Sequence, residues 1–371
     1  MDYVKQTVKD YAREIGFDLV GIASTETFQD HGSVTLKRIE QGFMDGLPWF
    51  TPSRVKRGMD PNKLLPGAKS IISVGLSYLV PSEDETNSLN GKVARYAWGD
   101  DYHKVMKKRL KLFVEGISQR LNRNINARWY VDDGPMLDRA VAQRSGVGWF
   151  GKNTNIINPE YGSWIFLGQI ITDLELVPDL PLKKTCGNCT RCIVDCPTSA
   201  IVAPFVIDNK KCISFLTIEN RGEIPRWLRP LMSDWVFGCD ICQDVCPVNV
   251  NSMYSKEQAF KKKRFTNIEL TGLLEMSQEE FSVRFSNSPI KRAKLEGLQR
   301  NACVALGNTG DRTVVKTLGI ALRNSSSIVR SHAAWALGQL KGKHAIKILE
   351  DSLIEETDGK VVKEIKEALI S

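Results

Sequence analysis

Eight of the nine cysteines in this 371-residue chain fall between Cys186 and Cys246, and their spacing is the strongest constraint on its fold. The first run is Cys186-x2-Cys189-x2-Cys192-x3-Cys196-Pro, the second is Cys239-x2-Cys242-x3-Cys246-Pro, and Cys212 lies between them. A Cys-x-x-Cys step lets one tight turn direct successive thiolates at a single metal centre. Spacing this regular therefore indicates a set of metal ligands.

The first run matches the pattern of bacterial ferredoxins, in which three cysteines bind one [4Fe-4S] cluster and the fourth binds the other cluster. Under that rule the first cluster is held by Cys186, Cys189, Cys192 and Cys246. The second cluster is held by Cys196, Cys212, Cys239 and Cys242. None of the eight is left over, so we predict two [4Fe-4S] clusters.

Two other uses of these cysteines are disfavoured. Structural zinc could use two sets of four, but the first run does not have a zinc-ribbon spacing. Disulfides are typical of small secreted domains, and this chain is neither small nor preceded by an apolar signal segment. The ninth cysteine, Cys303, lies in an apolar helical run and is expected to be an inert core thiol.

The bulk composition is that of an ordinary globular protein, with 42% hydrophobic and 25% charged residues. No apolar run approaches the length of a membrane span, so we expect no membrane association. Reduced cysteines and a polar start to the chain predict a cytoplasmic location. The net charge of +8 suggests an anionic partner.

Helical and strand patterns alternate over residues 1–178. Apolar residues at helical spacing before Gly16 predict an amphipathic helix within 1–20, and the β-branched run 71–78 predicts a strand buried on both faces. We further expect strands at 17–23, 128–131 and 164–172, helices at 101–121 and 138–145, and a polar loop at 81–92. This alternation indicates an α/β or α+β domain over 1–178.

Pro178 and Pro181 mark a linker into the cysteine region. We therefore expect an α+β protein with a ferredoxin-like domain at 179–250 and a third unit at 251–371. In that last unit, residues 302–307 resemble residues 333–338 at an offset of 31. Each segment ends in a glycine (Gly307 or Gly338) that we expect to stop a helix, and second helices are expected at 313–323 and 343–354.

This pattern is similar to HEAT-like helical repeats, which stack helix pairs into a layer. Two repeats alone bury little apolar surface, so we expect the tail to pack on the body of the protein. Basic residues punctuate the region: Arg284, Lys291, Arg292, Lys294, Arg300, Arg312, Arg323 and Arg330. They are expected to form a phosphate-binding face, with salt-bridged helix surfaces as the alternative. The basic run 261–264 is interpreted as a solvated face.

A further stretch combines acids with closely spaced glycines. Asp132 and Asp133 follow an expected strand, and residues 146–155 contain three glycines with Lys152 and Asn153 among them. Glycines at this density let a backbone pass close to a ligand. From the residues alone, either acid could be a proton donor or could cap the helix after Pro135.

Taken together, these motifs resemble the epoxyqueuosine reductases, the cobalamin and iron–sulfur enzymes of queuosine tRNA modification. The resemblance covers nearly the whole chain. Its carriers are Pro66–Ser70, Arg95–His103, Asp132–Asn155, Pro159–Ser163, the eight cysteines, Cys212–Thr217 and the repeat tail.

The resemblance implies roles for individual residues. The first acid of the family's Val-Asp-x-Gly motif is the proton donor, which corresponds to Asp132. Cobalamin contacts correspond to Arg57, Ala94, Asp132, Ile156, Leu167 and Ser214. The Asp101-x-His103 stretch resembles a motif that supplies a histidine cobalt ligand, but Met106 replaces its glycine. His103 is therefore expected to be structural, and cobalamin to bind base-off without a protein histidine.

The implied reaction is reduction of the epoxide of epoxyqueuosine, at the wobble position of a tRNA anticodon stem-loop, to the alkene of queuosine. The implied partners are that tRNA and an external one-electron donor of flavodoxin or ferredoxin type, with the chain acting as a monomer. Three alternatives remain: a reductive dehalogenase, a ferredoxin-type electron carrier, and a non-enzymatic iron–sulfur RNA-binding protein. A reductive dehalogenase would not need a basic repeat tail. A ferredoxin-type electron carrier would not need the domain formed by residues 1–178.

Overall fold

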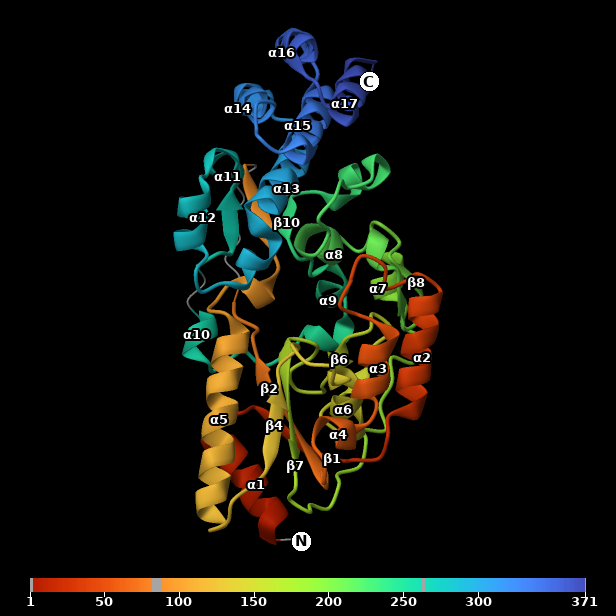
Figure 1. The fold of residues 1–371 in the computed structure, drawn as a ribbon, viewed down its shortest axis with the longest axis vertical. Coiled ribbons are helices and arrows are strands. Elements are labelled where there is room, and N and C mark those ends of the chain that lie inside the picture. Colours follow the sequence, from red (N-terminus) through yellow and green to blue (C-terminus); the bar gives the residue numbers. More distant parts are fainter. Residues whose placement is uncertain (1–2, 82–88, 262–263, 371) are drawn as a thin grey trace.

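A computed structural model of the chain describes residues 3–81, 89–261 and 264–370, and a four-stranded sheet organises its N-terminal part (Figure 1). The strand order is β1 (Leu19–Ser24), β2 (Ser70–Ser77), β7 (Ile165–Thr172) and β4 (Ala127–Tyr130), and all neighbours are antiparallel. Every residue of β2 is buried, which confirms the strand that the apolar run 71–78 predicts.

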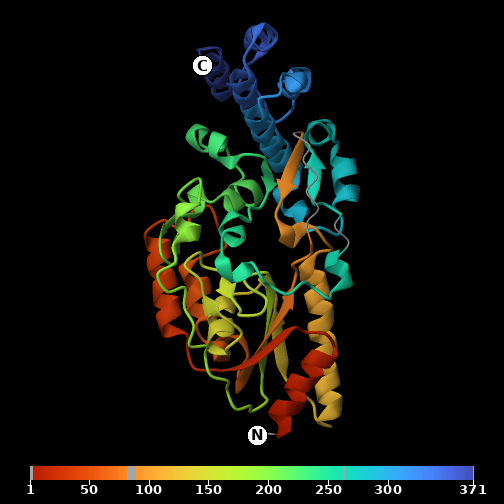
Figure 2. The same cartoon turned by 180° about the vertical axis from the view of Figure 1, so that it is seen from behind.

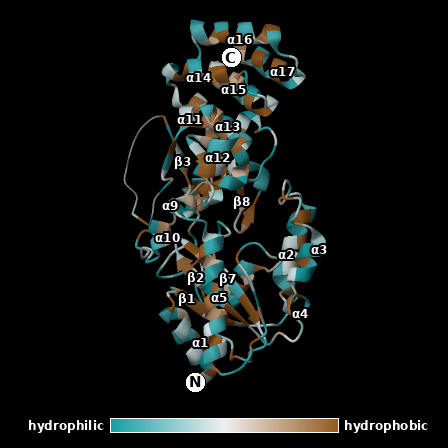
Figure 3. Ribbon diagram, turned by 60° about the vertical axis from the view of Figure 1, so that its left-hand side comes forward, coloured by the Kyte–Doolittle hydropathy of each residue, from teal (hydrophilic) through white to brown (hydrophobic). Residues whose placement is uncertain are grey.

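Helices cover both faces of this sheet (Figures 1 and 2). One face carries α1 (Tyr3–Glu14) and α5 (Tyr102–Arg120), and the other carries α6 (Asp138–Arg144), with α2 (Gln29–Glu40), α3 (Pro52–Gly58) and α4 (Pro61–Leu64) on the same side. Successive residues of β2 serve the two cores: Ile72 packs with Phe113, and Ile71 packs with Ala140. Burying each such apolar side chain contributes about 1.5–3 kcal/mol. Figure 3 shows hydrophobic residues concentrated in these strands.

The helices and strands expected over residues 1–178 are confirmed, including the stop at Gly16, whose φ of 91° is left-handed. The polar loop expected at 81–92 is wrong in its last residues, while residues 82–88 lie outside those described. Asn90–Val93 forms β3, between β10 (Trp235–Phe237), which runs parallel to it, and β11 (Asn267–Glu269), which runs antiparallel. A polar segment becomes a strand here because two distant segments pair with its backbone. A Cβ on Gly91 would lie 2.6 Å from the Leu270 and Val236 side chains, so a larger residue here would force those side chains to move.

The cysteine region consists of short elements between the sheet and the tail (Figure 1). Its helices are α7 (Arg191–Val194), α8 (Ile213–Ile218) and α9 (Ile241–Asp244), and its hairpin joins β8 (Ile201–Ala203) to β9 (Val206–Ile207). A second hairpin, β5 (Trp149–Phe150) and β6 (Ile156–Ile157), reaches this region from the N-terminal part. Among the described residues, no helix has both the length and the apolar character needed to cross a membrane.

The tail is helical and packs on the body. Its helices are α11 (Leu270–Glu275), α12 (Gln278–Arg284), α13 (Lys294–Thr309), α14 (Val315–Ala321), α15 (Ser327–Leu340), α16 (Lys343–Glu355) and α17 (Gly359–Ile370). One continuous buried core runs from Val93 in β3 through Leu298 in α13 to Ala368 in α17. This confirms that the tail buries its apolar stripe against the body.

Gly307 and Gly338 were expected to stop helices, and that expectation is wrong. Both lie inside helices, and α13 ends at Thr309 with Gly310, whose φ is 71°, as its C-cap. A Cβ on Gly307 would lie 2.8 Å from the Trp335 side chain, and a Cβ on Gly338 would lie 2.8 Å from Ala368. These glycines therefore allow close contact between helices.

Candidate functional site

The eight cysteines form two groups in space. Burial raises the pKa of the Cys192 thiol, and the neighbouring Cys186, Cys246 and Cys189 thiols raise it further. These four cysteines line one pocket, together with Lys152, Asn153, Ile157, Arg191 and Pro247. Cys246, more than fifty residues along the chain, is thus brought to the Cys186–Cys192 run.

The second group is formed by the remaining cysteines. Burial raises the pKa of Cys242 well above its ordinary value, and Cys212 and Cys239 raise it further. Burial also raises the pKa of Cys239, as do Cys212 and Cys196. Thiols that raise one another's pKa become thiolates when a metal centre supplies positive charge, so this donor set fits iron.

The geometry also bears on the zinc and disulfide alternatives. All nine cysteines are free. Within the described ranges, no three or more His, Cys, Asp or Glu side chains are arranged to hold a single metal ion. With Zn–S bonds of about 2.3 Å, tetrahedral zinc would need its sulfur ligands about 4 Å apart. A cluster of four irons spaces its cysteines more widely. Cys303 is fully buried in α13, as expected of a core thiol.

The glycine-rich stretch contacts the cysteine loops. The Lys152 Nζ donates to the carbonyl oxygens of Gly187 at 2.7 Å and Cys189 at 2.9 Å. The Asn153 Nδ2 donates to the carbonyl oxygen of Cys242 at 3.1 Å. One turn of the β5–β6 hairpin therefore holds a loop from each cysteine group. The closely spaced glycines of residues 146–155 predict that this backbone passes close to a ligand. In the structure, the contacts of Lys152 and Asn153 are with the protein backbone of the cysteine loops.

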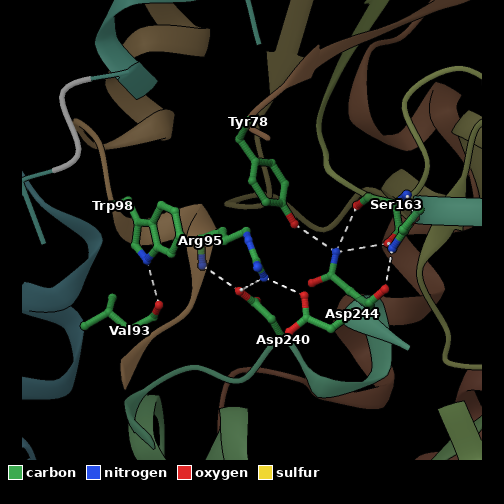
Figure 4. Close-up of polar contacts among 9 residues, drawn as sticks. Tyr78, Val93, Arg95, Trp98, Ser163, Asp240 and Asp244 are labelled. Atoms are coloured by element: carbon green, nitrogen blue, oxygen red, sulfur yellow. Dashed lines mark hydrogen bonds and ion pairs between the residues drawn. The ribbon is translucent and has the colours of Figure 1, made fainter. Parts of the chain in front are cut away.

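Arg95 also fixes the loop between Cys239 and Cys242, through Asp240 and Asp244 (Figure 4). Its guanidinium bonds Asp240 at 3.3 Å and Asp244 at 2.6 Å, and its backbone N–H donates to Asp240 Oδ2 at 2.8 Å. The same guanidinium lies 5.5 Å from the Trp98 ring centroid and 4.9 Å from that of Trp164. Asp240 is 2% exposed, so this partner offsets the cost of burying its charge.

A second buried contact extends this attachment to the N-terminal sheet. The Gln243 Nε2 donates to the Tyr78 hydroxyl at 3.0 Å and to the carbonyl oxygen of Ser163 at 3.1 Å. The Asn249 Nδ2 donates to the Ser163 hydroxyl at 2.9 Å. Buried polar groups that are fully bonded specify one arrangement, so the cysteine loop has a fixed position relative to the sheet.

Asp132 lies two residues after the end of β4, in a strained conformation. Its φ of 54° is left-handed, which costs free energy for a non-glycine residue and is common at functional sites. The residue is exposed, and its Oδ2 accepts a hydrogen bond from the Tyr102 hydroxyl at 3.1 Å. Tyr102 contacts Tyr96 (6.2 Å between ring centroids), and Tyr96 contacts Phe237 (5.9 Å), two residues before Cys239. Aromatic contacts thus connect the acid to the second cysteine group.

Asp133 is in a different electrostatic state. Burial alone would raise its pKa, but an ion pair with Lys107 and the N–H of Val131 hold the pKa of Asp133 below its ordinary value. Neither acid caps the following helix, because α6 begins at Asp138 with Leu137 at its N-cap and no side-chain cap. The helix-cap interpretation is therefore wrong for both.

A third carboxyl, Asp138, was missed by the sequence analysis. Burial, together with the nearby Asp132, raises its pKa to about 8. Its Oδ1 is sealed from solvent and has no hydrogen-bond partner among the described residues. Nothing in the local sequence distinguishes this acid from an ordinary first-turn helix residue. It becomes unusual only because α6 packs onto the sheet, where the Gln169 side chain donates to its backbone oxygen at 3.2 Å.

The six residues matched to cobalamin contacts come from separate elements. Ile156 in β6 is buried, and the half-buried Leu167 of β7 packs in the same apolar cluster. Ala94 donates its N–H to Phe237 at 2.8 Å, and Ser214 lies in α8 two residues after Cys212. These last two therefore border the second cysteine group.

Arg57 and Asp132 complete this set. Arg57 is exposed in the last turn of α3, and a Cβ on the next residue, Gly58, would lie 1.8 Å from the Pro135 carbonyl oxygen. This contact places the end of α3 against the loop that carries Asp132. His103 is tied down elsewhere: its Nδ1 lies 2.9 Å from Asp101 Oδ1, and its ring stacks on Tyr102 at 4.0 Å.

The basic residues of the tail divide into two kinds. Arg300 is 1% exposed and donates to the carbonyl oxygens of Leu216, Asn220 and Gly222, so placing it on a phosphate-binding face is wrong. Arg330 pairs with Glu356 at 2.7 Å. Arg292 pairs with Glu219, and Arg312 donates to Leu340. Four cations are exposed without an ion-pair partner among the described residues: Arg284, Lys291, Lys294 and Arg323. The run 261–264 lies partly outside those residues.

Fold and site together define an iron–sulfur protein in which two cysteine groups lie beside an acid-bearing α/β/α unit. Three family models match in agreement with this: epoxyqueuosine reductase QueG, DUF1730 over residues 59–133, a 4Fe-4S double cluster binding domain over 185–249, and HEAT repeats over 292–370. The iron–sulfur and HEAT-like predictions are thereby confirmed.

The chain belongs to the epoxyqueuosine reductase family. It is 39% identical over 307 residues to the epoxyqueuosine reductase of Atelocyanobacterium thalassa, covering 81% of this chain and 98% of the relative. A crystal structure of an epoxyqueuosine reductase with an epoxyqueuosine-modified tRNA-Tyr stem loop matches with a TM-score of 0.93 and 31% identity, over 99% of this chain and 98% of that chain. The Bacillus subtilis enzyme, solved with an aspartate catalytic loop swung out of its active site, matches with a TM-score of 0.92 and 31% identity, over 99% and 98%.

Replacing Cys212 by alanine should remove one cluster and leave the other. Wild-type protein prepared without oxygen should contain about eight iron and eight sulfide per chain, as two [4Fe-4S] clusters require, and the variant about half of each. Iron and sulfide analysis with electron paramagnetic resonance measures this. Cys303→Ala is the matched control, because it removes a buried thiol outside both groups. Full iron content in Cys212→Ala would refute the assignment.

Replacing Asp138 by asparagine should change how stability depends on pH. Because the folded-state pKa is raised to about 8 from an ordinary 3.8, the folded protein keeps a proton that the unfolded chain releases. Wild-type stability should therefore fall as pH rises between about 4 and 8, and the variant should lack this loss. The thermal midpoint of Asp138→Asn relative to wild type should increase from pH 5 to pH 8. A pH-independent difference would show that Asp138 titrates normally.

Proposed function

We propose that this chain reduces the epoxide of epoxyqueuosine at the wobble position of tRNA to the alkene of queuosine, the last step of queuosine biosynthesis. Two electrons and two protons are taken up and one water is released. The observation that carries this conclusion is the likeness, over 99% of the chain, to a reductase solved with an epoxyqueuosine-modified stem loop. The chain is accordingly an oxidoreductase.

Cobalamin is the cofactor that the site residues fit. The corrin is a broad apolar ring with polar amide arms, and the proposed contacts combine Ala94, Ile156 and Leu167 with the polar Ser214 and Arg57. Leu167 and Ser214 are half-buried and Arg57 is exposed, so their side chains are accessible to a ligand. When bound, cobalamin would supply an electron-rich cobalt for reduction of the epoxide carbon.

The histidines support base-off binding without a protein ligand to cobalt. His103, the residue nearest to the family's histidine motif, has its Nδ1 committed to Asp101 and its ring stacked on Tyr102. Its partner Asp101 is also the N-cap of α5 and accepts the backbone N–H of His103, so the carboxylate that binds the ring is itself held in place. These contacts give His103 a structural role, which supports a cobalamin site without a histidine ligand from the protein.

Asp132 is the proposed proton donor. Cleavage of the C–O bond leaves negative charge on the oxygen, so an acid at that oxygen lowers the barrier. Asp132 is exposed, while Asp133 is paired with Lys107 and stays ionised. Of the two neighbouring acids, Asp132 is thus the one whose side chain is not paired with a lysine. Tyr102 orients it through one carboxyl oxygen, leaving the other for the substrate.

The proposed function divides the chain into three domains. Residues 1–178 form the cobalamin-binding reductase domain, 179–250 the ferredoxin-like domain, and 251–371 the linker and repeats that bind tRNA. The clusters held by the assigned cysteines pass electrons one at a time from an external donor of flavodoxin or ferredoxin type. The chain is proposed to act as a cytoplasmic monomer.

The exposed cations of the tail are proposed to contact tRNA phosphates. Arg284, Lys291, Lys294 and Arg323 lie on α12, η5 (Pro289–Ala293), α13 and the end of α14, and none has an ion-pair partner among the described residues. Lysine and arginine contacts to phosphate release counterions, which makes such binding sensitive to salt.

Replacing Asp132 by asparagine tests the catalytic role. The variant keeps the shape of the side chain but loses its transferable proton, so conversion of epoxyqueuosine to queuosine in tRNA should fall by roughly 10²-fold or more. Nucleoside mass spectrometry after anaerobic incubation with a strong reductant measures the conversion. Cluster content and tRNA affinity should not change.

Asp133→Asn is the control for that experiment and should keep most of the activity, because Asp133 is bound to Lys107. If Asp133→Asn is inactive while Asp132→Asn is active, the proton donor is the second acid. If both variants are active, the proton comes from another group.

Charge reversal tests the tRNA-binding tail. The double substitution Lys291→Glu and Lys294→Glu should weaken binding of a tRNA stem-loop about tenfold or more at low salt and flatten its salt dependence. Electrophoretic mobility or fluorescence anisotropy measures this. Truncating the tail would be a poor test, because its removal would expose the core that joins it to the body. Lys111→Glu, on α5, is the matched control. If the double variant binds tRNA with unchanged affinity, these residues are ordinary solvated surface cations and do not contact tRNA.

A further inference from the structure

The two cysteine groups differ in their access to the surface. Around the first group, residues 183–185, 187–188 and 190–191 are exposed, and Cys186, Cys189 and Cys192 are themselves half-exposed. Their pocket is open on this side of the molecule, beside α7. An electron carrier could approach these three ligands without any rearrangement of the chain.

The cysteines of the second group are half-buried as well, but the segments that carry Cys212 and Cys239 pack against the interior, with Cys212 as the N-cap of α8. Cys239 packs on the largest hydrophobic core, and Ile213 and Leu216 of α8 are buried in that core. Asp240, next to Cys239, is 2% exposed and covered by Arg95. Electrons from outside the protein therefore have their direct entry at the first group.

Uncompensated positive charge surrounds that entry. Lys183, Lys184 and Arg191 are exposed, and none has an ion pair or a side-chain hydrogen bond among the described residues. The Lys152 ammonium bonds only to backbone carbonyls of the cysteine loop, so its charge is not neutralised either. Arg191 and Lys152 line the pocket itself. One acid, Asp195, is exposed at the end of α7.

We propose that this donor face, defined by Lys152, Lys183, Lys184 and Arg191, docks an acidic one-electron carrier protein. The inference rests on the proposed function, because that reaction needs two electrons from outside. In each of two encounters the reduced carrier loses one electron and the first cluster gains it. Redox partners bind through small interfaces in which opposite charge raises the association rate and orients the partner. The exposed Val194, which is 75% accessible, adds an apolar side chain to the face at the end of α7, two residues after Cys192.

RNA is the other polyanion that such a face could attract. The position of the charges favours the carrier, because they surround the ligands of a cluster, whereas the exposed cations of the tail lie on α12 to α14. Figures 1 and 2 both place those helices apart from α7. The donor face and the proposed tRNA contacts can therefore be tested separately.

The test is the rate at which a photoreduced acidic flavodoxin reduces the clusters, followed by stopped-flow absorbance without tRNA. The double variant Lys183→Glu and Lys184→Glu, and separately Arg191→Glu, should lower the second-order rate constant about tenfold or more at low salt. The difference from wild type should shrink as salt rises. Reduction by a small neutral photoreductant, and the iron content, should stay at wild-type values. Lys366→Glu, on α17, is the matched control and should have no effect.

An unchanged rate with flavodoxin in both variants would overturn the proposal. So would a loss of tRNA affinity in the lysine variant without any effect on flavodoxin, which would assign the face to RNA. Because the rate is measured without substrate, a failure of the chain to reduce epoxyqueuosine would leave this result intact.

Discussion

The attachment of the Cys239–Cys242 loop to the N-terminal sheet is the interaction on which the rest of the structure depends. Arg95 holds the loop through Asp240 and Asp244, while Asn153 bonds the Cys242 backbone. The loop contributes ligands to one proposed cluster, and Cys246, four residues after Cys242, completes the other. This one loop therefore fixes the position of both cysteine groups relative to the sheet, and Asp132 follows strand β4 of that sheet.

The acids near the end of β4 show how local environment assigns different states to one residue type. Asp133 shares an ion pair with Lys107 and has a lowered pKa. Asp138, five residues after Asp133, has an Oδ1 that is sealed from solvent without a hydrogen-bond partner among the described residues, and its pKa is raised to about 8. Asp132 precedes both and is exposed, with a left-handed backbone and the Tyr102 hydroxyl bonded to one carboxyl oxygen. Local environment thus shifts the pKa values of Asp133 and Asp138 in opposite directions.

Features set by local chemistry could be predicted from the sequence. The cysteine spacing gave ligand groups that the structure brings together, and the apolar run 71–78 gave a fully buried strand. The predictions that were wrong concerned features that depend on contacts between residues far apart in the sequence. Residues 90–93 form a strand because β10 and β11 pair with them, and Gly307 continues a helix because Trp335 packs against it. Arg300 is buried by carbonyl oxygens from residues 216–222, which no local pattern reveals.

The central claim is that acid, clusters and cobalamin act together on one tRNA-borne epoxide. The most direct measurement is nucleoside mass spectrometry of epoxyqueuosine-containing tRNA after anaerobic incubation with reconstituted, chemically reduced protein, with and without cobalamin. The account predicts conversion to queuosine, with loss of one oxygen atom, only when cobalamin is present. Equal conversion without cobalamin, or no conversion with it in protein that holds both clusters, would contradict the account.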